Sequence, residues 1–379
     1  MRQSVRLGRI AGIPVGAHWS VVIILAIFAD TLAVSVLPAE VPHRPAASYW
    51  AVGCIVAVLL MAALLAHELS HALVALHNGI GVRSITLWGL GGVSELEADP
   101  PDAGADLRIA LAGPAASLVA AAVFFGAAVA IGQAGGPRIL VAAAIWLSLM
   151  NGVLALFNLL PGAPLDGGRV LRAVLWRHHG DRDRAAISAA RSGRYLGALL
   201  AGLGVAELLM RGFLGGLWLM LIGWFLISAA AAEEGAARSS AALRGLRVAD
   251  VMTPDPEVAP GWFTITEFAD RIAAARSRQR AFPVLSSDAR LAGVVVTAEL
   301  ARLSPRQRTG RRIEQAALPV PARYRVAPDD PAGPLAARSP LGGEVVAVVL
   351  DQGRIVGMVT VADLRQAVLR HSLVAGSAR

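Results

Sequence analysis

The sequence of 379 residues contains a single cysteine and no lysine, and only 16% of its residues are charged. Because Cys54 has no second cysteine to pair with, no disulfide can form within the chain, and cysteine use says nothing about the redox compartment. Aromatic residues make up 5% of the chain and do not alternate with the arginines that supply its net charge of +8. This pattern argues against nucleic acid as a partner and favours positive charge beside a membrane.

Apolar residues are in excess, at 55%, and are concentrated before about Ala232. Six segments approach the ~20 residues that a helix needs to cross a bilayer. We predict spans at about 17–37, 48–76, 106–132, 138–160, 194–211 and 213–232. The predicted fold class is therefore a polytopic α-helical membrane protein, residues 1–237, followed by a cytoplasmic α/β domain, residues 238–379.

The placement of arginine predicts the topology of the membrane domain. Arg2, Arg6 and Arg9 lie in the N-terminal tail, and five more arginines lie in 177–194, which we interpret as a loop. Positive charge marks the cytoplasmic side, so both segments, and with six spans the C-terminal domain, should be cytoplasmic. The predicted location is the cell membrane. The high content of Ala, Gly and Arg is typical of a GC-rich bacterial genome.

A possible metal site lies in the second predicted span, where His67 and His71 are four residues apart and Glu68 follows the first histidine. Positions i and i+4 share one face of a helix, so both imidazoles can bind the same ion. This geometry suits zinc, with Glu68 beside it as the general base. Three ionisable residues in one apolar segment argue against an accidental match.

A catalytic zinc needs a third protein ligand and one open position for water, and Asp166 is the best candidate. It follows Pro161-Gly162-Ala163-Pro164, which breaks the fourth predicted span. An ionisable side chain at membrane depth is costly, and irregular backbone is tolerated there only beside protein or a water-filled cavity. Zinc would lower the pKa of water toward ~7, and Glu68 would pass the proton of that water to the leaving amine.

These residues resemble the two signatures of the site-2 protease family of intramembrane zinc metalloproteases. The signatures are His-Glu-x-x-His and Asn-x-x-Pro-x-x-x-Leu-Asp-Gly-Gly, and the second runs here from Asn158 to Gly168. The resemblance covers roughly residues 5–232. It implies one Zn²⁺ per chain held by His67, His71 and Asp166, with Glu68 as catalytic base. It also implies that Asn158 contacts the substrate backbone or the developing oxyanion; a helix-packing amide is the alternative.

Two segments are notable for their glycines, and the first is open to more than one interpretation. Residues 82–94 read as a short β-hairpin or an edge strand with a glycine turn. The resemblance implies that Gly91 and Gly92 lie in a hairpin that re-enters the membrane, where a strand edge could bind unwound substrate. A plain cytoplasmic turn is the alternative. Gly113 to Ser117 supplies small residues for close helix approach, and we assign it no chemistry.

The cytoplasmic region contains two similar units of roughly 60 residues, at about 247–304 and 317–371. They resemble a tandem pair of cystathionine-beta-synthase (CBS) domains, on Asp250–Pro254 at the start and Gly357–Leu364 at the end. The resemblance implies an adenine nucleotide held by a Thr-x-x-Asp step, present as Thr360 and Asp363. In the first unit Val296 and Glu299 take these positions, so we predict at most one nucleotide site. A purely structural dimerisation module is the alternative.

The combined features predict an intramembrane zinc endopeptidase that performs regulated intramembrane proteolysis under the influence of the CBS pair. The expected partners are a transmembrane protein substrate and membrane lipid, with a possible homodimer through the CBS domains and no nucleic acid. One alternative is a CBS-gated transporter with the histidines as a proton or metal path, although no second half matches the His67 segment as an inverted repeat would. The other is an inactive protease-like scaffold, which could lose Glu68; that residue is present.

Overall fold

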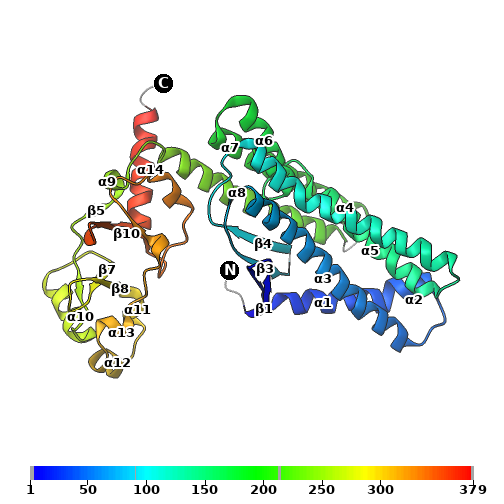
Figure 1. Cartoon of the computed structure of the whole chain (residues 1–379), viewed down its shortest axis with the longest axis horizontal. Coiled ribbons are helices and arrows are strands. Elements are labelled where there is room, and N and C mark those ends of the chain that lie inside the picture. The colour runs from blue at the N-terminus through cyan, green and yellow to red at the C-terminus, as the bar shows by residue number, and fades with distance from the viewer. Residues whose placement is uncertain (1–3, 90, 212–214, 377–379) are drawn as a thin grey trace. The chain divides into compact units, whose positions relative to one another are not determined.

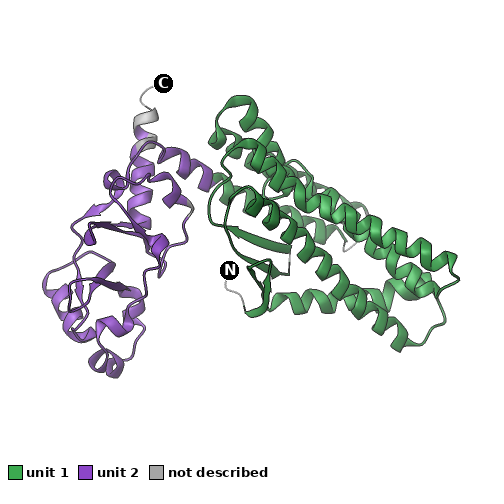
Figure 2. Ribbon diagram, viewed as in Figure 1, with its two compact units in different colours: residues 1–234 green, residues 235–379 purple. Residues whose placement is uncertain are grey.

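The structure is a computed structural model that describes residues 4–89, 91–211 and 215–376. The chain forms two compact units, Met1–Glu234 and Gly235–Arg379 (Figures 1 and 2). The division falls inside helix α8 (Gly215–Ala242), three residues before the boundary predicted from the sequence. Each unit has its own buried cores, and each is described by itself below.

Unit 1 contains six helical segments, within the described residues, that are long and apolar enough to cross a membrane. The first joins α1 (Ser20–Asp30), a π-helical stretch (Thr31–Val36) and α2 (Leu37–Glu40). The others are α3 (Ala46–His77), α4 (Ala103–Gln133), α5 (Arg138–Asn158), α7 (Arg182–Arg211) and α8. The 32 residues of α3 extend over about 48 Å, which exceeds the ~30 Å hydrocarbon core of a bilayer. The predicted polytopic helical fold is confirmed.

The prediction of a loop at 177–194 is wrong. Helix α6 (Asp166–His179) reaches into this region and stops at Gly180, whose φ of 72° is the left-handed conformation that closes many helices. Helix α7 then begins at Arg182, so all five arginines of 177–194 lie on helices. Charge indicates the side of the membrane but not the backbone conformation. The basic last turn of α6 and its terminal glycine were the available signals for a helix end.

A four-stranded sheet lies in unit 1, in the order β1 (Val5–Ile10), β2 (Ile13–Ala17), β3 (Val82–Trp88), β4 (Gly91–Leu96). The predicted hairpin is confirmed, since β3 and β4 pair antiparallel. The first two strands were interpreted as a tail, and that prediction is wrong. Strand β2 pairs parallel with β3, which lies far along the chain, so the sheet is completed only by folding. Strands β1 and β4 are its two edges.

A buried ion pair fastens α6 to α4. The guanidinium of Arg172 donates from Nε and Nη2 to the two carboxylate oxygens of Asp106, at 2.9 and 2.8 Å. Asp106 is fully buried, and Arg169 adds a longer contact of 3.6 Å. Burial lowers the pKa of Arg172, but its hydrogen bonds and the charge of Asp106 outweigh this and raise the pKa above its usual value. The pair therefore holds the helix that begins with Asp166.

Helices α7 and α8 approach each other through glycines and a buried carboxylate. A side chain at Gly197 or Gly204 would overlap the backbone of α8, at Gly223 and Gly216 respectively. Such small residues are what allow membrane helices to come close. At the end of unit 1, Glu234 is buried and accepts hydrogen bonds from Arg191 and Arg194 of α7, at 3.2 and 3.0 Å.

Unit 2 is an α/β fold with two small sheets, as predicted. The first sheet has the order β6 (Ala259–Pro260), β7 (Ala281–Leu285), β8 (Leu291–Val296). The second has the order β5 (Thr253–Pro254), β11 (Arg354–Thr360), β10 (Val345–Asp351), β9 (Arg325–Val326). The helices are α9 (Val248–Val251), α10 (Ile265–Ala274), α11 (Thr297–Ala301), α12 (Pro305–Gly310), α13 (Ile313–Ala316) and α14 (Val361–Gly376).

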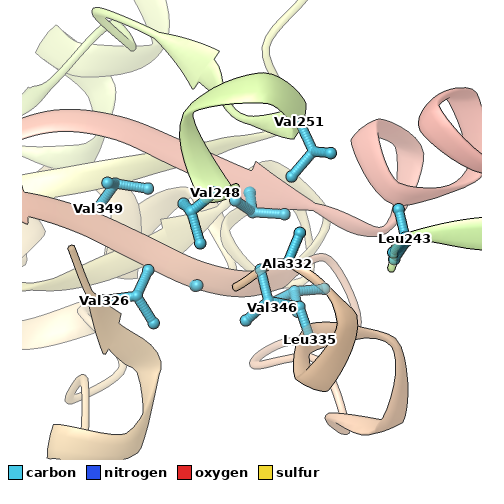
Figure 3. Close-up of a cluster of buried hydrophobic side chains, with 10 residues drawn as sticks. Leu243, Val248, Val251, Val326, Ala332, Leu335, Val346 and Val349 are labelled. Atoms are coloured by element: carbon cyan, nitrogen blue, oxygen red, sulfur yellow. The ribbon is translucent and has the colours of Figure 1, made fainter. Parts of the chain in front are cut away.

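The two repeats of unit 2 are interlocked rather than sequential. The segment that we predicted to open the first repeat completes the second sheet, because Thr253 pairs with Met358 of β11. Just before it, Val248 and Val251 are buried in one cluster with Val346 of β10 (Figure 3). The similarity of the two repeats reveals their number but not which sheet each segment joins.

The Asp106–Arg172 pair leads to a prediction about stability. Asp106→Asn leaves a buried guanidinium without its charged partner, so we expect the free energy of unfolding to fall by about 3 kcal/mol. Arg83→Gln is the matched control, because Arg83 and Glu95 are half-exposed and 3.8 Å apart, and such a pair contributes roughly 0–1 kcal/mol. Thermal unfolding of the purified membrane protein measures both, and equal midpoints for the two variants would contradict the role given to Asp106.

Candidate metal centre

The structure brings together the three residues predicted as metal ligands. His67 and His71 are buried on α3, and Asp166 is the first residue of α6. The Oδ2 atom of Asp166 lies 3.1 Å from Nε2 of His67 and 3.2 Å from Nε2 of His71. The two Nε2 atoms are 3.3 Å apart. Among the described residues, this is the one group of three such side chains with donor atoms close enough to share an ion.

The triangle of donor atoms fits a tetrahedral zinc ion. Zinc binds imidazole nitrogen and carboxylate oxygen at roughly 2.0–2.2 Å, which separates two ligand atoms by about 3.3 Å in a tetrahedron. The three observed separations, 3.1, 3.2 and 3.3 Å, match this value. Two nitrogens and one oxygen are also the donor set of several catalytic zinc sites, which leave the fourth position open.

Helix α4 fixes how the two imidazoles are oriented. The Nδ1 atom of His71 is 2.6 Å from the carbonyl oxygen of Ile109, and Nδ1 of His67 is 2.8 Å from the hydroxyl of Ser117. A carbonyl can only accept, so Nδ1 of His71 carries the proton and Nε2 presents its lone pair to the site. We assigned no role to Ser117 from the sequence. Its signal was a hydroxyl four residues after Gly113, within the apolar stretch 109–132.

The absence of a side chain at Gly113 gives the imidazoles room. A Cβ atom at this position would overlap Nε2 of His71 and lie 2.5 Å from Nε2 of His67. We predicted close helix approach for this segment, but the approach is to the two ligand atoms themselves. Gly113 thus lets the backbone of α4 form one wall of the centre.

The non-helical segment 159–165, between α5 and α6, places Asp166 beside the two histidines. Side chains at Gly167 and Gly168 would overlap backbone atoms of 159–163, so only glycines allow α6 to start there. The loop is held on α7, where the amide of Ala163 donates to the carbonyl of Ala189 at 3.1 Å and Ser192 donates to the carbonyl of Pro161. At the first position of a helix, the carboxylate of Asp166 is also favoured by the helix dipole.

Glu68 points to strand β4 rather than to α4. Its Oε2 atom accepts a hydrogen bond of 3.0 Å from the hydroxyl of Ser94. A Cβ atom at Gly92 would lie 2.6 Å from the Glu68 Cδ atom, so this glycine lies directly against the carboxylate. Gly91, by contrast, has no neighbour within 4 Å of such an atom and has a φ of 147°, which favours glycine.

Asn158, the remaining residue predicted in the active site, is the last residue of α5 and is half-buried. Asn158 lies just before the turn that leads to Asp166. The carbonyls of the next two residues occupy the space that a side chain at Gly167 would need. The predicted contact of Asn158 with substrate stays a prediction.

The Thr360–Asp363 step closes the N-terminus of α14. Each residue caps the other: Asp363 N donates to Thr360 Oγ1 at 3.2 Å, and Thr360 Oγ1 donates to Asp363 Oδ2 at 2.7 Å. The second oxygen of Asp363 accepts from Thr253 at 2.9 Å. Asp363 and Thr253 line a cavity of about 410 Å³ within unit 2, together with Asp250 and Arg370. In the first repeat Val296 is buried and Glu299 pairs with Arg302.

The space at Gly113 leads to a prediction about metal content. Gly113→Ala puts a methyl group against the two imidazoles. We therefore expect purified protein to hold less than a tenth of the zinc of the wild type, because changes to the groups that surround metal ligands alter affinity roughly 10–100-fold. Gly126→Ala is the control on the same helix, since its Cβ meets nothing within 4 Å. Elemental analysis of both variants decides the matter, and full zinc in Gly113→Ala would contradict the proposed packing.

Among solved structures, the chain is similar to a site-2 protease from Methanocaldococcus jannaschii. The identity is 28%, the match covers 61% of this chain and 94% of that one, and the TM-score is 0.42. The chain is also similar to the CBS domain of a bacterial CNNM/CorC family Mg²⁺ transporter, solved in complex with ATP. That match has 21% identity, covers 36% of this chain and 97% of the other, and has a TM-score of 0.30.

Sequence comparison identifies the family. The model of Peptidase family M50 matches residues 55–144 and 133–200. A protein of Mycobacterium tuberculosis named as the zinc metalloprotease Rip3 is 44% identical over 365 residues, which cover 96% of this chain and 92% of that protein. A Synechocystis protein named as the zinc metalloprotease sll0528 is 35% identical, over 79% and 78% of the two chains. The chain therefore belongs to peptidase family M50, the site-2 protease family of membrane zinc metalloproteases.

Proposed function

We propose that this protein cleaves transmembrane segments of other membrane proteins, with unit 1 as the protease and unit 2 as its regulator. The observation that carries the proposal is the convergence of His67, His71 and Asp166 beside a bundle of helices that are long and apolar enough to span a membrane, with Glu68 next to His67 on α3. A hydrolytic centre built there can act only on a peptide bond that enters the bilayer or its boundary. Cleavage of such a bond would release a cytoplasmic fragment of the substrate.

Each residue of the centre has a separate role in this reaction. When bound by His67, His71 and Asp166, Zn²⁺ supplies a Lewis acid that makes water nucleophilic near neutral pH. Ser117 and the carbonyl of Ile109 keep the imidazoles in the orientation that binding needs. Glu68 accepts the proton of the attacking water and delivers it to the leaving amine. We propose Asn158 as a contact for the substrate backbone or the oxyanion.

The substrate docks on strand β4 in this proposal. A transmembrane helix uses its own carbonyls and amides in internal hydrogen bonds, so the segment must unwind before its peptide bond can be attacked. An unwound segment needs new backbone partners, and an edge strand supplies them by strand addition. Strand β4 is an edge of its sheet, and Gly91 and Gly92 at its start carry no side chain that would obstruct the segment.

The remaining surfaces of unit 1 suit a bilayer. Large apolar side chains on α4, such as Val119, Val123 and Phe125, are each about 60% exposed, and lipid is the partner that such a surface fits. The arginine-rich ends of α6 and α7 favour placing them, the N-terminus and unit 2 on the cytoplasmic side. We propose this topology for a bacterial cell membrane.

The candidate nucleotide site that we propose in unit 2 is the cavity lined by Asp363 and Thr253. The cavity beside Asp363 and Thr253 has a volume in the range of ordinary ligand pockets, roughly 300–1,000 Å³. The corresponding step of the first repeat has the apolar Val296 in place of a hydroxyl, which supports one site for an adenine nucleotide rather than two. The exposed Leu369 and Leu373, one turn apart on α14, supply an apolar face for the proposed homodimer.

The proteolytic function is tested with Glu68→Gln. Loss of a general base lowers a rate by roughly 10²–10⁴-fold, so we expect wild type to cleave single-span substrates and the variant to be almost inactive. Both should hold one zinc per chain. The matched control is Glu40→Gln, at the far end of the first span, which should cleave as wild type does. Cleavage by Glu68→Gln at the wild-type rate would contradict the assigned role, and absence of zinc from folded wild type would contradict the metal site.

The nucleotide site is tested by titrating the full-length protein with ATP, ADP and AMP. We expect at most one nucleotide per chain and at least tenfold weaker binding by Asp363→Asn, because a lost charge-assisted hydrogen bond is worth about 1.5–3 kcal/mol. Glu299→Gln, at the matching position of the first repeat, should bind as wild type does. Tight binding of two nucleotides per chain would overturn the single-site proposal.

A further inference from the structure

One face of strand β4 is directed inward, toward helix α3. Its residues alternate, so Gly92, Ser94 and Leu96 share the inward face while Val93 is exposed. Leu96 packs on the buried cluster that includes Ile80. Ser94 is therefore a hydroxyl on the inner face of an edge strand, next to a glycine that lies against Glu68.

Ser94 is bonded to Glu68 at two points. Its Oγ atom is 3.0 Å from the carboxylate Oε2 and 3.3 Å from the carbonyl oxygen of the same residue. A hydroxyl carries one proton, and a charged carboxylate is the stronger acceptor, so the shorter contact is the bond that matters. The other oxygen, Oε1, lies beside Gly92, whose missing side chain leaves it uncovered by β4.

We propose that Ser94 is a positioning residue for Glu68, and that the strand on which the substrate docks thereby sets the general base in place. A free glutamate side chain samples many rotamers. The free energy of one charge-assisted hydrogen bond is comparable to the entropy cost of holding the side chain in a single rotamer. Ser94 binds Oε2 and leaves Oε1 to take the proton. Because Ser94 belongs to β4, a substrate strand that restrains β4 also restrains the carboxylate. The inference rests on the function proposed above.

The first test separates positioning from folding by kinetics. For Ser94→Ala we expect kcat to fall about 10–100-fold, with the zinc content unchanged and KM little changed, because the lost contact acts on the base and not on docking. Ser94→Thr keeps the hydroxyl and suits a strand, so it should recover most of kcat. Ser148→Ala is the control: its partly buried hydroxyl bonds the carbonyl of Ala121 on another helix. Equal kcat for Ser94→Ala and Ser148→Ala would overturn the proposal.

The second test does not need activity. Thermal midpoints are measured for Ser94→Ala, Glu68→Ala and the double variant, all with zinc bound. If the two side chains interact, the shifts of the single variants will sum to more than the shift of the double variant. Additive shifts would overturn the proposal, as would zinc loss in both Ser94→Ala and Ser94→Thr. An inactive wild type with coupled midpoints would instead count against the proteolytic function and leave the contact established.

Discussion

The packing of α4 against α3 and α6 holds the metal centre together. One buried stripe of α4 presents Asp106, Ile109, Gly113 and Ser117 at intervals of three and four residues, which is the spacing of one helix face. In this order along the helix, Asp106 binds α6 and Ile109 orients the imidazole of His71. Gly113 leaves room for both imidazoles, and Ser117 orients that of His67. The candidate ligands come from α3 and α6, and α4 orients their imidazoles.

This arrangement answers a constraint that the membrane imposes. Polar groups taken out of water are costly unless each finds a partner, and a bundle of apolar helices has few partners to offer. Here the polar groups satisfy one another: imidazole with hydroxyl and carbonyl, guanidinium with carboxylate, and Glu68 with Ser94. Catalytic and structural groups therefore form connected networks, and removing one member leaves another buried without a partner.

The three candidate ligands could be picked out from the sequence because each has a local signal: two histidines lie one helical turn apart, and an aspartate follows a double proline break. Six spans were also predictable from their apolar length. Gly113, Ser117 and Ser94 could not be assigned roles, since each acquires its function only when another element comes within contact distance. The same holds for β1 and β2, which join a strand far along the chain, and for Thr253, which completes the sheet of the other repeat.

The triangle of two imidazole nitrogens and one carboxylate oxygen also has a consequence for competition among cations in the cell. Mg²⁺ and Ca²⁺ require roughly six to eight oxygen ligands, and only one is available here. Cu²⁺ binds nitrogen more strongly than zinc does, but prefers a tetragonal arrangement of ligands. The donor atoms come from α3 and α6 and lie 3.1–3.3 Å from one another, which is the spacing of tetrahedral rather than square ligands. Both the identity of the three donor atoms and their close spacing therefore favour zinc over the other cations at this centre.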